Sequence, residues 1–314
     1  KRWVYKGAKV VYIPLKANGI QSILYDIVSI CHAIFKADVL LVLGVSGCII
    51  LPLIRLFSRK NIIVNIDGLE HRRAKWSNYV RKFLKFSESL AVKYATHIIT
   101  DNKGIQDYVE KEYGKKSALI EYGGDHVICD TNDMEEEILG KYQLPENGYS
   151  LALCRIEPEN NVEMILRAFV ASGELLVFIG NWHNSEFGRR LKEEYETISN
   201  IKLLEPIYDI KVLILLRTYC KFYLHGHSAG GTNPSLVEAM YFGRPVFAFN
   251  VVYNRETTEG KAGYFGNEQE LIALMNEDGE EVWKRNGEAM REIAYRRYCW
   301  NVIADKYERL YLKN

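Results

Sequence analysis

Short apolar runs rich in β-branched residues alternate with helical segments along almost the whole chain. In the first half, strands are predicted at residues 9–13, 39–43, 61–66, 97–100 and 118–120. A second series places strands at residues 150–154, 175–179, 201–204, 222–225 and 245–248. This alternation is typical of βαβ units, whose parallel strands are covered by helices on both faces. The pattern therefore predicts an α/β fold built on parallel sheets.

A polar, acidic stretch at residues 125–147 separates the two series and predicts a connection with a short helix. A chain of 314 residues is also longer than one hydrophobic core usually supports. We therefore predict two doubly wound, Rossmann-like domains that face each other across a cleft. Their expected limits are residues 1–125 for the first domain, 126–148 for the linker, 149–296 for the second domain and 297–314 for a C-terminal helix.

Composition excludes several classes of protein. The net charge of +1 gives no general attraction to nucleic acid, so no such partner is expected. The six cysteines are scattered without metal-ligand spacing, which predicts buried free thiols in a reducing compartment. The longest apolar run, residues 39–54, is broken by glycine, serine and proline and is shorter than the about 20 residues of a membrane span. The first residues lead directly into the strand pattern, so we expect no signal peptide and a cytoplasmic protein.

Ligands of parallel α/β sheets bind at the carboxyl ends of strands, in the loops that lead into helices. Four loops have this position: residues 67–73, 155–161, 180–183 (with Asn181) and 226–234. In the last, HGHSAGGTNPSLVEAM, Asn233 is a strong N-cap candidate and Pro234 suits the first helical position. The next three backbone N–H groups are then expected to be free to bind an anion, with Glu238 reaching neutral hydroxyls. A packing turn followed by a solvated glutamate explains the loop equally well by itself.

Two arginines follow other strands of the second domain. Arg155 comes directly after a strand in LALCRIEPENN, where it can bind phosphate through two hydrogen bonds. A surface ion pair with Glu157 or Glu159 is the alternative. Arg255 follows the strand at residues 245–248 and is expected to supply a second cation on the same side of the sheet.

The first domain offers a different chemistry. Asp67 and Glu70 follow a strand in IIVNIDGLEHRRAKW, where two carboxylates can bind a hydroxylated acceptor or act as a base. Local capping and ion pairing is the alternative. Six Lys and Arg residues between 72 and 85 are interleaved with aromatic residues, which suits an anionic lipid surface as well as an ordinary solvated face.

Five separated motifs together resemble a known family: VNIDGLEHRRAKW, RIEPENN, PIYD, HGHSAGGTNPSLVEAM and YNRE. They are similar to retaining glycosyltransferase family 4 of the GT-B class, and within it to the bacterial rhamnosyltransferase-like branch. The resemblance runs from about Tyr12 to the end of the chain. It implies metal-independent transfer of a sugar from a nucleotide donor, with no cofactor. It also implies that the last helix crosses back to the first domain.

The candidate site residues, taken from the strand-end loops and from the resemblance together, fall into three groups. Catalytic roles are implied for Asp67, Glu70, Arg155 and Glu238, the last of which matches the glutamate that holds the donor ribose. An acceptor or membrane side is implied for Arg72, Arg73, Lys75 and Trp76. The donor is expected to contact Arg155, Asn160, Asn161, Asn181, Gly230, Gly231, Thr232, Asn233, Pro234, Ser235, Glu238 and Arg255.

The chain departs from the family pattern at several positions. Gly230 stands where the first glutamate of the family pair would fall, Asn160-Asn161 replace the usual lysine, and Asp67 replaces a histidine. No glycine-rich strand-loop segment is found at the start, so we expect the first domain to be incomplete at its N-terminus.

The sequence thus predicts a glycosyltransferase at the inner face of the plasma membrane. It would transfer a sugar with retention, L-rhamnose from a dTDP- or UDP-linked donor, to a polyprenyl-diphosphate-linked saccharide in capsule, O-antigen or exopolysaccharide synthesis. One alternative is a nucleotide-sugar 2-epimerase of the same fold, which would need no acceptor. The other is a non-catalytic subunit of a polysaccharide assembly complex.

Overall fold

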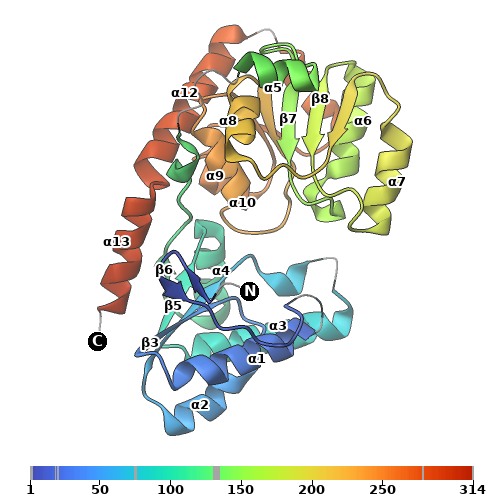
Figure 1. The fold of residues 1–314 in the computed structure, drawn as a ribbon. Helices are drawn as coiled ribbons and strands as arrows, with labels where there is room; N and C mark the ends of the chain where they lie inside the picture. The colour runs from blue at the N-terminus through green and yellow to red at the C-terminus, as the bar shows by residue number, and fades with distance from the viewer. Residues whose placement is uncertain are drawn as a thin grey trace. The chain divides into compact units, whose positions relative to one another are not determined.

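The computed structural model of the chain divides into two compact units, which are treated separately below (Figure 1). The first unit contains residues 1–100, 106–119 and 310–314, and the second contains residues 101–105 and 120–309. The structure describes residues 3–17, 19, 21–73, 76–129, 135–277 and 279–312, and for residues 135–137 the backbone only.

A four-stranded parallel sheet forms the centre of the first unit. Its strands follow one another in sequence order, β3-β4-β5-β6, and β4 is almost entirely buried. Because a strand buried on both faces is rich in apolar side chains, the run NIIVNI, with Ile or Val at four of its six positions, occupies this position. The strands are β3 (Val39–Leu43), β4 (Asn61–Ile66), β5 (His97–Thr100) and β6 (Ala118–Leu119); the helices are α1 (Gln21–Ile34), α2 (Leu51–Phe57), α3 (Asn78–Tyr94) and α4 (Lys103–Tyr113).

The predicted strand at residues 9–13 is wrong. Only two short strands form near the start, β1 (Val4–Tyr5) and β2 (Ala8–Lys9), and they pair with each other in an antiparallel hairpin. The following residues carry a strand-like apolar pattern, but among the described strands none pairs with them. A strand needs a neighbour for its backbone hydrogen bonds, so apolar alternation alone does not create one.

The second unit contains a six-stranded parallel sheet with strand order β12-β11-β10-β7-β8-β9. The chain enters at β7, proceeds outward through β8 and β9, and then returns to the other side of β7 with β10, β11 and β12. This reversal confirms the doubly wound prediction for the second unit. The strands are β7 (Ser150–Leu153), β8 (Leu176–Ile179), β9 (Ile201–Leu204), β10 (Phe222–His225), β11 (Val246–Phe249) and β12 (Gly263–Phe265).

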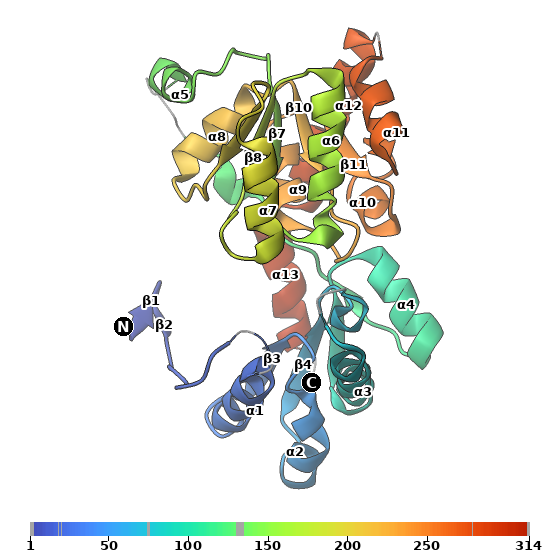
Figure 2. The same cartoon turned by 90° about the vertical axis from the view of Figure 1, so that its right-hand side faces the viewer.

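Helices cover both faces of this sheet, and alternate strand residues pack into two separate cores. In β8, Val177 and Ile179 face the core formed with α5, α8, α9 and α12, whereas Leu176 and Phe178 face the core formed with α6, α7 and α11. Figure 2 shows α6 and α7 over the latter face. The helices are α5 (Glu135–Tyr142), α6 (Val162–Ser172), α7 (Glu186–Tyr195), α8 (Ile210–Thr218), α9 (Pro234–Met240), α10 (Val252–Thr257), α11 (Glu268–Met275), α12 (Glu280–Arg297) and α13 (Trp300–Tyr311).

The helical tail breaks between α12 and α13. Tyr298 is buried at the break, where its hydroxyl donates to the Thr257 carbonyl oxygen over 2.8 Å. The Trp300 N–H donates to Asp125 Oδ1 over 2.8 Å and so caps the next helix. The helical tail therefore consists of two helices, α12 with 18 residues and α13 with 12.

Two expectations about chemistry and membranes can be compared with the described residues. All six cysteines are free, but only Cys48 and Cys220 are buried residues, in contrast to the buried thiols expected; Cys129 is exposed, and the others are half-buried. Burial raises the pKa of the Cys154 thiol to about 12, which keeps it protonated. Among the described helices, none has the length and apolar character needed to cross a bilayer.

Candidate functional site

The point where the strand order reverses lies between β7 and β10 in the second unit. These neighbours are parallel, with Ala152 opposite Leu224, so both chains leave the sheet at the same edge. The loops that follow, residues 154–161 and 226–233, are therefore adjacent. Parallel sheets bind ligands in the crevice that forms at such a reversal. The topology places two of the four predicted loops there.

Direct hydrogen bonds join these two loops. The Ser228 N–H and hydroxyl donate to the Glu159 carbonyl oxygen over 2.9 and 2.8 Å. The Asn161 side-chain amide donates to the Gly226 carbonyl oxygen over 2.8 Å. A Cβ atom at Gly226 would lie 2.2 Å from the Asn160 carbonyl oxygen, so only glycine allows this approach. Asn161 thus serves the framework of the site.

Arg155 extends from the first of these loops, and its side chain is 61% exposed. The Asn160 amide donates to the Arg155 carbonyl oxygen over 2.7 Å and fixes the backbone there. The guanidinium Nη1 lies 3.6 Å from Glu157 Oε1, the surface ion pair that the sequence left open as the alternative. Exposed pairs of this kind are worth at most about 1 kcal/mol, so an anionic ligand can compete for the arginine.

The glycine loop is shaped by an aspartate from the start of the second unit. Gly230 has φ +133°, a conformation that L side chains rarely adopt. A Cβ atom at Gly231 would lie 2.0 Å from Asp101 Oδ1. The Thr232 hydroxyl donates to the Asp101 carbonyl oxygen over 2.5 Å. The close approach of Asp101 thus requires glycine at position 231. Residues near Gly231 in the sequence do not indicate this requirement.

The expectation of free amides at the start of α9 is wrong. The Ser235 N–H donates to Asn233 Oδ1 over 3.1 Å, and the Leu236 and Val237 N–H groups each donate to the Asn233 carbonyl oxygen over 3.1 Å. Asn233 is the N-cap that the sequence predicts, and Pro234 is the first helical residue. Because these three N–H groups already donate to oxygen atoms of Asn233, this helix end does not offer three open donors to an anion.

Glu238 is bound on both of its carboxylate oxygens. Arg217 Nη2 donates to Oε2 over 2.5 Å, and His126 Nε2 lies 3.4 Å from Oε1. Arg217 is 1% exposed, and its Nε and Nη1 groups have no hydrogen-bond partner among the described residues. The Trp300 indole N–H donates to His126 Nδ1 over 3.1 Å, so a neutral His126 carries its proton on Nε2, toward Glu238. The glutamate is therefore held in place, in contrast to the solvated alternative.

Two further residues predicted to bind the donor, Asn181 and Arg255, follow strands other than β7 and β10. Asn181 is exposed in the loop after β8. The Arg255 guanidinium carbon lies 4.1 Å from the Tyr264 ring centroid in β12, and its Nε donates to Asn250 Oδ1 over 2.7 Å. These contacts direct Arg255 toward the edge strand. Arg155 is consequently the better placed of the two arginines for a ligand at the reversal point.

His225, the last residue of β10, is fully buried and stacks on His227 with ring centroids 4.3 Å apart. Neither ring nitrogen of His225 has a partner among the described residues. Burial, with a smaller effect from His227, holds the pKa of His225 well below 6.5. His225 therefore stays neutral in the native protein. As the pH falls below about 6.5, the unfolded chain binds a proton at this residue and the native protein does not.

We expect the free energy of unfolding to fall by about 1 kcal/mol between about pH 6.5 and 5.5 through His225 alone. Urea unfolding across this range should show a smaller slope for His225→Leu than for the parent. His183 on the surface is the matched control, because its side chain is 62% exposed. Equal slopes for the parent and His225→Leu would contradict the assignment.

In the first unit, the loop after β4 holds the predicted acceptor-side residues. Glu70 Oε1 lies 2.8 Å from Arg73 Nε, and the Trp76 indole N–H donates to Glu70 Oε2 over 3.2 Å. Asp67 and Arg72 are exposed beside this network, and Lys75 lies outside the described residues. Glu70 is therefore engaged in the local ion pairing that the sequence left open.

A buried carboxylate beneath this loop was not identified from the sequence. Glu88 on α3 accepts hydrogen bonds from His71 Nδ1 (3.0 Å), Tyr108 (2.7 Å) and Tyr113 (2.6 Å). Burial alone would raise the pKa of Glu88, but these donors hold it below its usual value. The only available signal was a glutamate on the apolar face of an amphipathic helix. Its role is to fix His71 just after Glu70.

Comparison with known proteins agrees with this geometry. Residues 134–289 match the family described as glycosyl transferases group 1, and residues 1–125 match a domain of unknown function, DUF1972. No curated protein sequence matches the chain.

Solved structures with the same fold include Anabaena HepE in complex with UDP, at 15% identity and a TM-score of 0.72 over 90% of this chain and 80% of that one. The HepE complex with UDP-glucose has a TM-score of 0.74 at 15% identity, over 90% and 81%. Sucrose-phosphate synthase from Thermosynechococcus elongatus has 15% identity and a TM-score of 0.72, over 90% and 75%. The chain therefore has the GT-B fold, and its residues 134–289 form a glycosyltransferase domain of group 1.

Proposed function

We propose that this protein transfers a sugar from a nucleotide-diphosphate donor bound where the strand order of the second unit reverses. The observation that carries the proposal is the junction of the β7 and β10 loops, which brings the exposed Arg155 beside the glycine loop that precedes Glu238. The HepE complexes with UDP and UDP-glucose support a donor of this class, because HepE shares the fold. We call the group formed by Arg155, Gly230, Gly231 and Glu238 the switch-point site.

The two charged members of this site, Arg155 and Glu238, have distinct roles in the proposal, and neighbouring residues support them. Arg155 neutralises the diphosphate, whose charge grows as it leaves the sugar. Glu238 accepts hydrogen bonds from the ribose hydroxyls. Arg217 and His126 act as positioning residues, because each contacts a different carboxylate oxygen of Glu238. Asn160 and Asn161 support the site by fixing the two loops.

The finer features of the proposal rest on the sequence resemblance. They are L-rhamnose as the sugar, dTDP or UDP as the nucleotide, retention at the anomeric carbon, and catalysis without metal. The acceptor is a polyprenyl-diphosphate-linked saccharide at the inner membrane face, used in capsule, O-antigen or exopolysaccharide synthesis. The exposed Tyr79, Lys82 and Phe86 on one face of α3 support contact with an anionic lipid surface.

Isothermal titration of the full chain with UDP, dTDP, ADP and UMP tests the donor site. We expect at least one diphosphate to bind more tightly than UMP, with the same affinity in the presence of EDTA. Arg155→Ala should weaken diphosphate binding by about tenfold to a hundredfold, because one charge-assisted contact is lost. UMP binding should change much less.

Arg285→Ala is the matched control, since this arginine lies on the outer face of α12 with its side chain 75% exposed. Absence of any nucleotide binding would refute the proposed function. Binding that needs a divalent metal would refute only its metal-independent form.

A further inference from the structure

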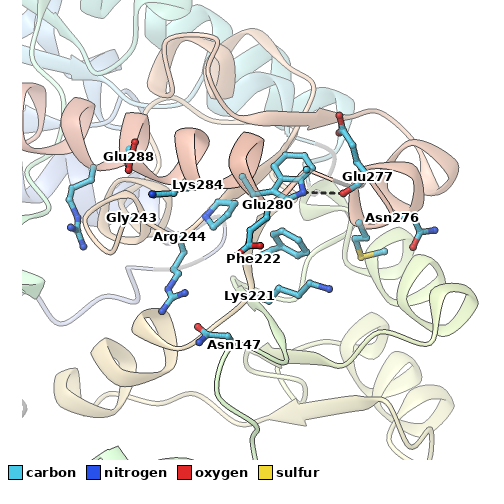
Figure 3. Close-up of a pocket in the computed structure, with 15 residues that line it drawn as sticks. Asn147, Lys221, Phe222, Gly243, Arg244, Asn276, Glu277, Glu280, Lys284 and Glu288 are labelled. Atoms are coloured by element: carbon cyan, nitrogen blue, oxygen red, sulfur yellow. Dashed lines mark hydrogen bonds between the residues drawn. The ribbon is translucent and has the colours of Figure 1, made fainter.

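A cavity of about 910 Å³ lies in the second unit, at the end of the strands opposite to the switch-point site (Figure 3). Its lining includes Lys221 and Phe222 at the amino end of β10, and Arg244 and Pro245 directly before β11. The switch-point site follows the carboxyl ends, so the cavity is not part of it. Small-molecule sites commonly have volumes of about 300–1,000 Å³, and this one falls in that range.

Cationic side chains reach this cavity from three separate segments. Arg244 precedes β11, Lys284 extends from α12, and Lys221 precedes β10 (Figure 3). Arg291, also on α12, is a further lining residue. Arg244, Lys284 and Arg291 form no ion pair with any residue in the described part of the chain, and Lys221 makes a 3.3 Å pair with Glu174. Glu277, Glu280 and Glu288 also line the cavity, but none of these carboxylates forms an ion pair with the four cations among the described residues, so the cations can still interact with an anionic ligand. The arrangement therefore favours a ligand with a phosphate or carboxylate group.

Acceptors and an aromatic wall complete the lining. Trp283 packs edge-on against Phe222 and Phe247, and its indole N–H donates to the Glu277 carbonyl oxygen over 3.4 Å. The carboxylates of Glu280 and Glu288 also line the cavity. Carboxylates would repel a simple anion but accept hydrogen bonds from hydroxyl groups. Cations, hydroxyl acceptors and an indole together suit a sugar that carries an anionic group.

The walls of the cavity are held by direct backbone packing. A Cβ atom at Gly287 would lie 2.0 Å from the Gly243 carbonyl oxygen, so α12 rests on the turn before β11. Gly243 has φ +64°, and a Cβ atom there would lie 3.0 Å from Arg291 Nε. These contacts fix Arg291 and Trp283 relative to Arg244 before any ligand arrives, which lowers the entropic cost of binding.

From these observations we infer that the cavity is a second saccharide site, which binds a sugar bearing a phosphate or carboxylate group. It is separate from the donor site and does not depend on the proposed transfer reaction. Two sources share this chemistry: a free sugar phosphate, and an acidic unit of a longer saccharide.

Titration calorimetry of the full chain with glucose 6-phosphate, tetragalacturonate, glucose and inorganic phosphate tests the inference. At least one of the two anionic sugars should bind, at least about tenfold more tightly than glucose or phosphate. Preference for the first identifies a free sugar phosphate as the ligand, and preference for the second an acidic saccharide. Saturation with UDP should leave this affinity unchanged. No binding of either sugar, or equal binding of inorganic phosphate, would overturn the inference.

Variants locate the binding site. Arg244→Gln should weaken binding of the preferred sugar by about tenfold or more, because it removes a charged donor. Lys284→Gln is a second variant at an exposed position, where folding is not at risk. Arg285→Gln, one residue along α12 and outside the cavity lining, should bind like the parent. If the lining variants bind as tightly as Arg285→Gln, the sugar occupies another site and the inference fails.

Discussion

Replacing Glu238 with alanine is expected to lower the free energy of unfolding by about 3–5 kcal/mol. The reason is Arg217, which is 1% exposed and whose only described ion pair is with this carboxylate. Without the glutamate, a buried guanidinium keeps its charge but loses its counterion. Hydrogen exchange measured by mass spectrometry should localise the loss to α8 and α9, because a protein with two units need not unfold in one step.

Two further variants separate this cause from a general effect of mutation. Glu281→Ala breaks the pair with Arg285, whose side chains are 68% and 75% exposed, and should change the stability by less than about 1 kcal/mol. The double variant Arg217→Met with Glu238→Leu removes both charges and should recover most of the loss. A Glu238→Ala protein as stable as the parent would show that Arg217 does not depend on this carboxylate. The nucleotide titration of Glu238→Gln then reports separately on the proposed ribose contact.

Glu88→Ala is expected to destabilise the first unit by about 3–5 kcal/mol. The variant removes the hydrogen-bond acceptor that His71, Tyr108 and Tyr113 share. Because the Glu88 side chain is only 1% exposed, water does not readily replace this acceptor. Hydrogen exchange should increase in α3 and α4. The pKa of Glu88 is lowered in the native state, so its contribution is present above the usual glutamate range and is lost as the pH falls through the lowered value.

Glu112 provides the matched control for this network. It also pairs with Lys85 on the same side of the unit, over 2.8 Å, but its side chain is 45% exposed. Glu112→Ala should therefore stay within about 1 kcal/mol of the parent. Equal exchange rates in Glu88→Ala and Glu112→Ala would refute the structural role given to the buried carboxylate.

The parts of the fold that were predictable from sequence depend on local patterns. The run NIIVNI is buried on both faces and forms β4, and Asn233 with Pro234 marks the start of α9. Both follow from backbone propensity and hydrophobic periodicity, which operate within a few residues. The choice of residues 155–161 and 226–234 as ligand loops also needed only the order of strands and helices.

The failures arise where a residue's partner is distant in the sequence. The strand predicted at residues 9–13 has an apolar pattern, but among the described strands none is its neighbour. Gly231 is required by Asp101, which is far from it along the chain, and Glu88 is explained by donors from the η2 turn (Glu70–Arg72) and α4. Single-sequence patterns contain no record of such pairings.

The sequence by itself determined the α/β class, the positions of most strands and the loops that carry the switch-point site. Hydrophobic periodicity and capping chemistry are local, and they suffice for those features. Only the tertiary structure decided that Glu238 is bound by Arg217 and His126, that the α9 amides are already satisfied, and that cationic side chains from three segments line one cavity together with Trp283. The physical reason is that burial and charge pairing depend on which surfaces meet when the chain folds.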